Sequence, residues 1–151
     1  MAMKPFEIKT SIVIEATPAK VHEVLNDLSR LEDWNPFLTM DKSVTFSLSE
    51  KTVGPGAIFD YQGKRIGKGR MEIISSGPTC IRSTMTFFNK KTEIANTEYC
   101  LEPEFEGTRV TWTMSGDRSL KMHLMGTLLG FDKMMANNFA NGLKVLKAII
   151  E

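Results

Sequence analysis

Residues 118–151 read RSLKMHLMGTLLGFDKMMANNFANGLKVLKAIIE, a stretch without proline after a long run of mostly strand-like sequence. If these residues are helical, one arc about 100° wide collects large apolar side chains. They are Leu120, Leu124, Leu128, Phe131, Met135, Phe139, Leu146 and Ile149. A helix of about 30 residues is about 45 Å long, close to the width of a domain of this size. We therefore expect one unbroken C-terminal helix lying across a sheet, with space for a binding cavity between them.

The remaining sequence predicts that sheet. Residues 7–15 alternate as a strand, and Thr17-Pro18 begins a helix over 18–29, with a second short helix over 31–34. Strand-like segments then follow at 44–49, 57–62, 66–74, 79–88, 92–101 and 109–115, separated by turns. This order of one strand, two helices, six strands and a long helix predicts an α+β domain with a seven-stranded antiparallel sheet.

Composition narrows the class of protein. The chain has 151 residues, 25% charged residues and a net charge of +1, which predicts a single domain over residues 1–151. No basic footprint for nucleic acid is present, and no segment has the roughly 20 apolar residues of a transmembrane helix. The N-terminus lacks the apolar run of a signal peptide, so we expect a cytoplasmic protein.

The hairpin around the polar loop 89–91 allows a register prediction. If Lys90 is central, Arg82 faces Glu98 and Cys80 faces Cys100 on the outer side of the sheet. The inner side then carries Ile81, Ser83, Met85 and Phe87 opposite Tyr99, Thr97, Ala95 and Glu93. In a reducing compartment we expect the two cysteines to be free thiols rather than a disulfide.

Glycine and methionine positions suggest where the cavity lies. Gly67 and Gly69 face inward with Met71, and the missing side chains either leave room for a ligand or mark a bend in the sheet. Methionines on inward positions suit either ordinary core packing or an adaptable binding surface. Beside the main arc, Met122, Met125 and Leu129 form a second apolar patch that needs a cover, such as loops at the cavity mouth or a dimer partner.

Motifs for chemistry are few. No nucleophile, phosphate-binding or zinc-binding pattern occurs, so we predict no metal and no cofactor. Glu93 and Asp132 are the candidates for a general acid or base if burial raises the pKa of either. Asp132 and Asn138 also suit polar positions on a cavity wall, or simply solubility of the helix. Trp34 and Phe37 either gate the cavity or plug the end of the core.

Several segments resemble the polyketide cyclase/dehydrase and lipid-transport group of the START-like (SRPBCC, Bet v 1-like) superfamily. They are SIVIEATPAKV at 11–21, DWNPF at 33–37, IGKGRMEI at 66–73, TRVTWTMSG at 108–116 and FDKM at 131–134. The resemblance implies a helix-grip fold with a deep apolar cavity. It carries over no catalytic residues, because the family mixes lipid and hormone binders, cyclases and chaperone-activating domains.

Three functions follow as hypotheses. The first is non-enzymatic binding of a lipid, isoprenoid or polyketide in the cavity, possibly for transport or sequestration. The ligand-binding residues would be Trp34, Phe37, Phe59, Tyr61, Gly69, Met71, Met85, Phe87, Trp112, Met114, Leu128, Asp132 and Met135. The second is a cyclase or dehydratase that uses Glu93 or Asp132. The third is a protein-binding module related to Hsp90 activators, or a homodimer formed through Met122, Met125 and Leu129.

Overall fold

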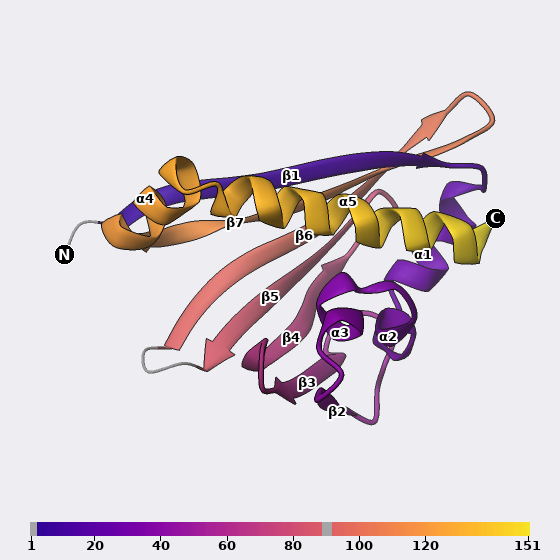
Figure 1. Ribbon diagram of the computed structural model, residues 1–151. Helices are drawn as coiled ribbons and strands as arrows, with labels where there is room; N and C mark the ends of the chain where they lie inside the picture. The colour runs from indigo at the N-terminus through magenta and orange to yellow at the C-terminus, as the bar shows by residue number, and fades with distance from the viewer. Residues whose placement is uncertain (1–2, 89–91) are drawn as a thin grey trace.

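The computed structural model describes residues 3–88 and 92–151 (Figure 1). Its strands are β1 (Met3–Ile14), β2 (Thr45–Leu48), β3 (Ile58–Gly63), β4 (Gly67–Ser76), β5 (Cys80–Phe88), β6 (Thr92–Glu104) and β7 (Gly107–Ser119). Its helices are α1 (Pro18–Leu25), α2 (Leu31–Trp34), α3 (Pro36–Met40), α4 (Leu120–Leu128) and α5 (Phe131–Ile150), with a 3-10 turn at Leu28–Arg30. The strands form one seven-stranded antiparallel sheet in the order β1-β7-β6-β5-β4-β3-β2. The α+β helix-grip prediction is confirmed.

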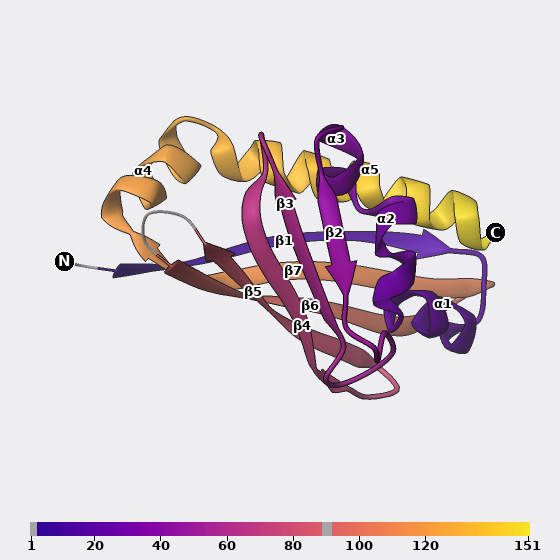
Figure 2. The same cartoon turned by 90° about the horizontal axis from the view of Figure 1, so that it is seen from below.

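Helix α5 runs along β1, and α2 and α3 lie beside it (Figures 1 and 2). The interior is filled along α5 from Phe139 to the end of the helix. Phe139, Leu143 and Leu146 are fully buried, and Phe139 stacks on Trp112 of β7 with ring centroids 3.9 Å apart. Solid packing therefore occupies the end of the grip near the C-terminus.

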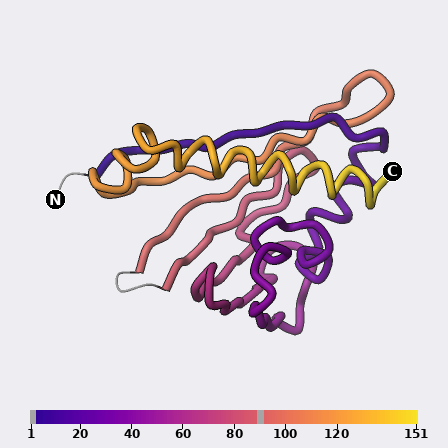
Figure 3. Tube along the Cα trace, in the orientation of Figure 1, coloured from indigo at the N-terminus to yellow at the C-terminus, as the bar shows by residue number. Residues whose placement is uncertain are grey.

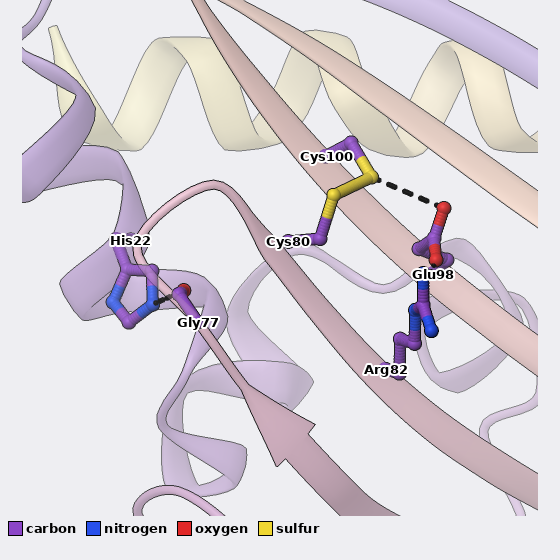
Figure 4. The surroundings of a disulfide bond; sticks show 6 residues. All are labelled: His22, Gly77, Cys80, Arg82, Glu98 and Cys100. Carbon is purple, nitrogen blue, oxygen red and sulfur yellow. Dashed lines mark hydrogen bonds and ion pairs between the residues drawn. A yellow bond between two sulfur atoms is a disulfide. The ribbon is translucent and has the colours of Figure 1, made fainter.

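The predicted hairpin register is confirmed. Cys80 pairs with Cys100 and Arg82 with Glu98, while the loop 89–91 itself lies outside the described residues. The expectation of free thiols is wrong, because Cys80 and Cys100 form a disulfide (Figure 4). Side chains directly opposite on one face of neighbouring strands lie within bonding reach, and the register prediction already placed these two so. Figure 4 also shows His22 of α1 beside Gly77, where its Nε2 donates to the Gly77 carbonyl oxygen at 2.9 Å.

The unbroken C-terminal helix is also wrong. Strand β7 extends to Ser119, which caps α4 through the Met122 amide, and Gly130 separates α4 from α5 with a left-handed φ of 77°. Helical periodicity does not detect such a break, because the apolar spacing continues through it. The break turns the first part of the predicted apolar arc away from the sheet, so that Leu120, Leu124 and Leu128 are exposed.

The segment after β1 differs in its helix ends. The predicted helix over 18–29 stops at Leu25, because the Asp27 side chain accepts from the Ser29 amide and starts a separate 3-10 turn. The short helix over 31–34 is confirmed, but α3 was not predicted; Asn35 caps it through the Phe37 amide. Strands β6 and β7 are also longer than predicted, and the turn between them projects beyond the rest of the sheet (Figure 3).

Candidate ligand-binding pocket

A pocket of about 480 Å³ lies between the inner face of the sheet, α3 and the N-terminal half of α5. Its wall is mainly apolar, and it occupies the end of the grip that Phe139 and Leu143 do not fill. The following predicted residues line it: Phe37, Phe59, Tyr61, Met71, Met85, Phe87, Trp112, Met114 and Met135. Pockets of this size and apolar character are typical of small-molecule sites.

Strand alternation explains why these side chains meet. Phe59 pairs with Met71, Met71 with Met85, and Met85 with Ala95, so one inward row crosses β3, β4, β5 and β6. Because side chains of a strand alternate between faces, each of these residues points to the same side of the sheet. Residue Asn138 of α5, expected at the wall, lines the pocket from the helix side.

Four predicted residues lie elsewhere. Trp34 is 1% exposed and packs edge-on against Tyr99 and Trp112, so it belongs to the core and does not gate the pocket. Leu128 is 76% exposed on α4, because the break at Gly130 turns it outward, and its predicted place on the wall is wrong. Gly69 and Asp132 are close to the pocket but do not line it either.

Gly69 makes room for a side chain of the protein itself. Tyr61 pairs with Gly69 across β3 and β4, and the Tyr61 ring lies directly over the glycine. A Cβ atom at residue 69 would come within 2.8 Å of Tyr61 Cε1, and closer still to the phenol end of the ring. The space that the sequence suggested for a ligand is thus filled by Tyr61, whose pKa is raised to about 12 by burial.

Asp132 forms an ion pair at the α4 end of the pocket. Arg118 donates through both terminal nitrogens to its carboxylate, at 2.6 and 2.7 Å, and the guanidinium also lies over the Phe6 ring. The hydrogen bonds from Arg118 hold the pKa of Asp132 below its ordinary value, although partial burial opposes them. The raised pKa that a general acid at this position needs is therefore contradicted.

Glu93 is exposed at the rim of the pocket, opposite Phe87. It lacks the desolvation on which the catalytic hypothesis depended. Within residues 3–88 and 92–151, Cys80, Glu98 and Cys100 are the one group with the spacing of metal ligands. Both sulfur atoms of that group are held in the disulfide.

Sequence reasoning overlooked the polar part of the wall. The inner face of β5 to β7 carries Thr97, Tyr99 and Trp112 at the pocket, with Ser83 buried beside them. The register prediction had placed Ser83, Thr97 and Tyr99 on this face, and Trp112 was predicted to bind ligand, but the face was interpreted as mostly apolar. The signal that reveals them is the strand alternation itself, since every second residue from Glu93 to Tyr99 must face inward.

A curved antiparallel sheet that grips a C-terminal helix beside an apolar pocket defines the START-like class of proteins. The chain belongs to the family described as "Polyketide cyclase / dehydrase and lipid transport", which matches residues 5–151. The resemblance drawn from the sequence is thereby confirmed. Among proteins with curated descriptions, none matches the chain.

Solved structures share the fold at low sequence identity. The Aha1 dimer from Colwellia psychrerythraea is 18% identical with a TM-score of 0.68, over 97% of this chain and 96% of that one. Protein CV1439 from Chromobacterium violaceum is also 18% identical with a TM-score of 0.68, over 96% of each chain. Ara h 8.0201 is 15% identical with a TM-score of 0.61, over 99% of this chain and 98% of that one. At these identities the likeness extends to the fold alone.

Proposed function

We propose that this protein is a ligand-binding domain over residues 1–151 that binds an apolar small molecule, such as a lipid, isoprenoid or polyketide. The observation that carries the proposal is the apolar pocket beside a packed core, because a chain that only needed stability would fill this space. The family description, which includes lipid transport, agrees with it. The proposal includes no reaction, since Asp132 is paired with Arg118 and Glu93 is exposed.

Two neighbouring residues of β6 provide a matched test. Ala95 is 4% exposed and lines the pocket, whereas Asn96 is exposed on the outer face. Ala95→Leu should displace part of any ligand and weaken binding of the uncharged dye N-phenylnaphthylamine about tenfold, from roughly two excluded CH₂ groups. Asn96→Leu adds leucine on the same strand and should leave dye affinity unchanged.

Dye titration of both variants, with thermal unfolding to confirm that each is folded, decides the matter. Equal dye binding by the two variants would contradict ligand binding in this pocket. Native mass spectrometry of freshly purified protein, followed by solvent extraction, identifies any ligand that copurifies. An extracted lipid-like molecule lost in Ala95→Leu and kept in Asn96→Leu would support the proposal directly.

A second candidate is self-association through α4. Leu128 and Leu129 are 76% and 77% exposed, and together with Met125 they border a shallow apolar groove. Met122, which was predicted to belong to the same patch, lines the ligand pocket instead. A neighbour in fold is described as a dimer. Sedimentation should then give a dimer that Leu128→Glu dissociates and that Thr127→Glu, on the same helix, does not. A monomer at high concentration would exclude it.

A cytoplasmic location remains part of the proposal, and the disulfide is the observation that tests it. No helix within the described part of the chain is long and apolar enough to cross a membrane. Disulfides are nevertheless typical of oxidising compartments. Trapping of free thiols in acid-quenched cells should label Cys80 and Cys100 if the protein is cytoplasmic, and should leave both unlabelled if it is exported.

A further inference from the structure

Five buried side-chain polar atoms on β5, β6 and β7 have no hydrogen-bond partner among the described residues. One of them, Arg118 Nε, belongs to a guanidinium whose two terminal nitrogens are paired with Asp132. The other four lie together on the inner face of the sheet. They are Ser83 Oγ, Thr97 Oγ1, Tyr99 Oη and Trp112 Nε1, and their residues are only 2–3% exposed. Buried polar groups are nearly always paired, since an unpaired one costs about 1–3 kcal/mol. Four unpaired atoms on one face therefore call for an explanation outside the protein's own side chains.

The register gathers these atoms into one patch, which we call the polar patch. Ser83 pairs directly with Thr97, and Tyr99 pairs directly with Trp112. Thr97 and Tyr99 are two residues apart on β6 and so share a face. Thr97, Tyr99 and Trp112 line the pocket, and Ser83 is buried next to Thr97 on the neighbouring strand. The polar patch is thus a compact part of an otherwise apolar wall.

The chemistry of the polar patch restricts what it can bind. The indole Nε1–H of Trp112 can only donate, so its partner must be an acceptor, and the hydroxyl groups can donate to the same acceptor. The charged pocket residues of these strands are Glu93 on β6 and Asp117 and Arg118 on β7. Glu93 is four residues from Thr97 and Arg118 is six residues from Trp112, which is about 13 to 20 Å along a strand. Arg118, the cation among them, is already paired with Asp132. No cation is therefore placed on β6 or β7 to balance an anionic group at the patch.

We propose that the polar patch is a subsite that donates hydrogen bonds to an uncharged oxygen of the ligand, a carbonyl or a hydroxyl. The inference rests on the proposed function and specifies its ligand class: an apolar body that carries a neutral oxygen at the end buried against Trp112. Burial raises the pKa of Tyr99, so its phenol is held in the donating, neutral form.

Matched tricyclic probes test the subsite. Fluorene and fluorenone have the same shape but differ in one carbonyl oxygen, and fluorene carboxylate adds a charge. In displacement of N-phenylnaphthylamine, fluorenone should bind the native protein at least about tenfold more tightly than fluorene, from two or more hydrogen bonds. Thr97→Val with Tyr99→Phe removes only the two hydroxyl groups and should reduce that preference by about tenfold, with fluorene affinity unchanged. Thr113→Val, on the outer face of β7, is the control and should retain the preference.

The outcomes separate the two proposals. Equal affinity for fluorene and fluorenone, or a preference that survives Thr97→Val/Tyr99→Phe, would overturn the subsite and leave the binding proposal intact. Tightest binding by fluorene carboxylate would overturn it too. Failure of every probe to displace dye would overturn the proposed function and the subsite together.

An infrared measurement needs no variant. The carbonyl stretch of fluorenone bound to the native protein should lie below its frequency in an apolar solvent, because hydrogen bonding weakens the bond. An unshifted stretch would refute the subsite even if the double variant did not fold.

Discussion

A methyl group at residue 69 should collide with Tyr61, and the size of the effect follows from the geometry. The Cβ of Gly69→Ala would lie 2.8 Å from Tyr61 Cε1, whereas real Cβ contacts almost never fall below 3.0 Å. The half-buried Tyr61 ring must therefore move from its place over the strand. Overpacking of this kind typically costs about 1–3 kcal/mol, and since the ring is a flexible side chain we expect the lower half of that range.

The assay is a double-mutant cycle followed by urea unfolding. Tyr61→Ala removes the obstacle, so Gly69→Ala in that background should be neutral or slightly stabilising, because alanine restricts the unfolded chain. The coupling free energy between the two changes should be about 1–2 kcal/mol. Asn96→Ala, on the outer face of the sheet, should show no coupling to Tyr61→Ala.

Additive effects of Gly69→Ala and Tyr61→Ala would refute this reasoning. They would mean that the Tyr61 ring does not lie over Gly69, and that the space beside the glycine is open to a ligand, as the sequence alone suggested. The dye affinity of Gly69→Ala is a second, independent measurement. If the space beside the glycine is open, the added methyl group should weaken dye binding without lowering the free energy of unfolding.

Three further predictions concern the frame of the pocket. Asp132→Asn should lower the free energy of unfolding by about 2 kcal/mol, because the Arg118 side chain, 10% exposed, loses its charged partner. The pKa of Asp132 is depressed in the folded protein. The stability contributed by the ion pair is therefore present above the unfolded pKa of about 3.9 and is lost as the pH falls through the folded pKa. Urea unfolding from about pH 7 to pH 2 should therefore show the two proteins converging in acid, and a constant difference would contradict it. Replacement of both Cys80 and Cys100 by alanine should cost about 3 kcal/mol for a closed loop of this length, and unchanged stability of the native protein in reductant would argue against the disulfide. Gly130→Ala should cost about 1 kcal/mol, because φ is 77° there, whereas a gain in stability would indicate the single unbroken helix.

Local alternation was enough to predict the sheet. The register centred on residue 90 follows from a two-residue period, and it correctly placed Arg82 against Glu98 and Met85 against Ala95. That same regularity predicted the inward row that now lines the pocket, including Phe59 and Met71. Such features depend on residues that are near in sequence or directly paired, and they can therefore be predicted from the sequence.

Features that depend on three-dimensional placement were not predictable. The spacing of apolar residues is the same whether or not Gly130 takes a left-handed conformation, so the turn of α4 away from the sheet has no signature in the pattern. The position of the Tyr61 ring over Gly69 depends on a side-chain torsion, and the core position of Trp34 depends on how α2 meets β6 and β7. Asp132 was misread because its partner Arg118 belongs to the end of a strand then expected to be helical.

The stack of Phe139 on Trp112 lies between two parts of the interior, a packed core on one side and the pocket on the other. On the C-terminal side of that stack the side chains are fully buried, and close packing there tolerates little change in side-chain volume. Substitutions on the opposite side, around Met85 and Phe87, alter the shape of the pocket without changing the buried side chains of Leu143 and Leu146. In a fold divided in this way, a few mutations in the pocket can change which ligand is bound with little effect on the stability of the core.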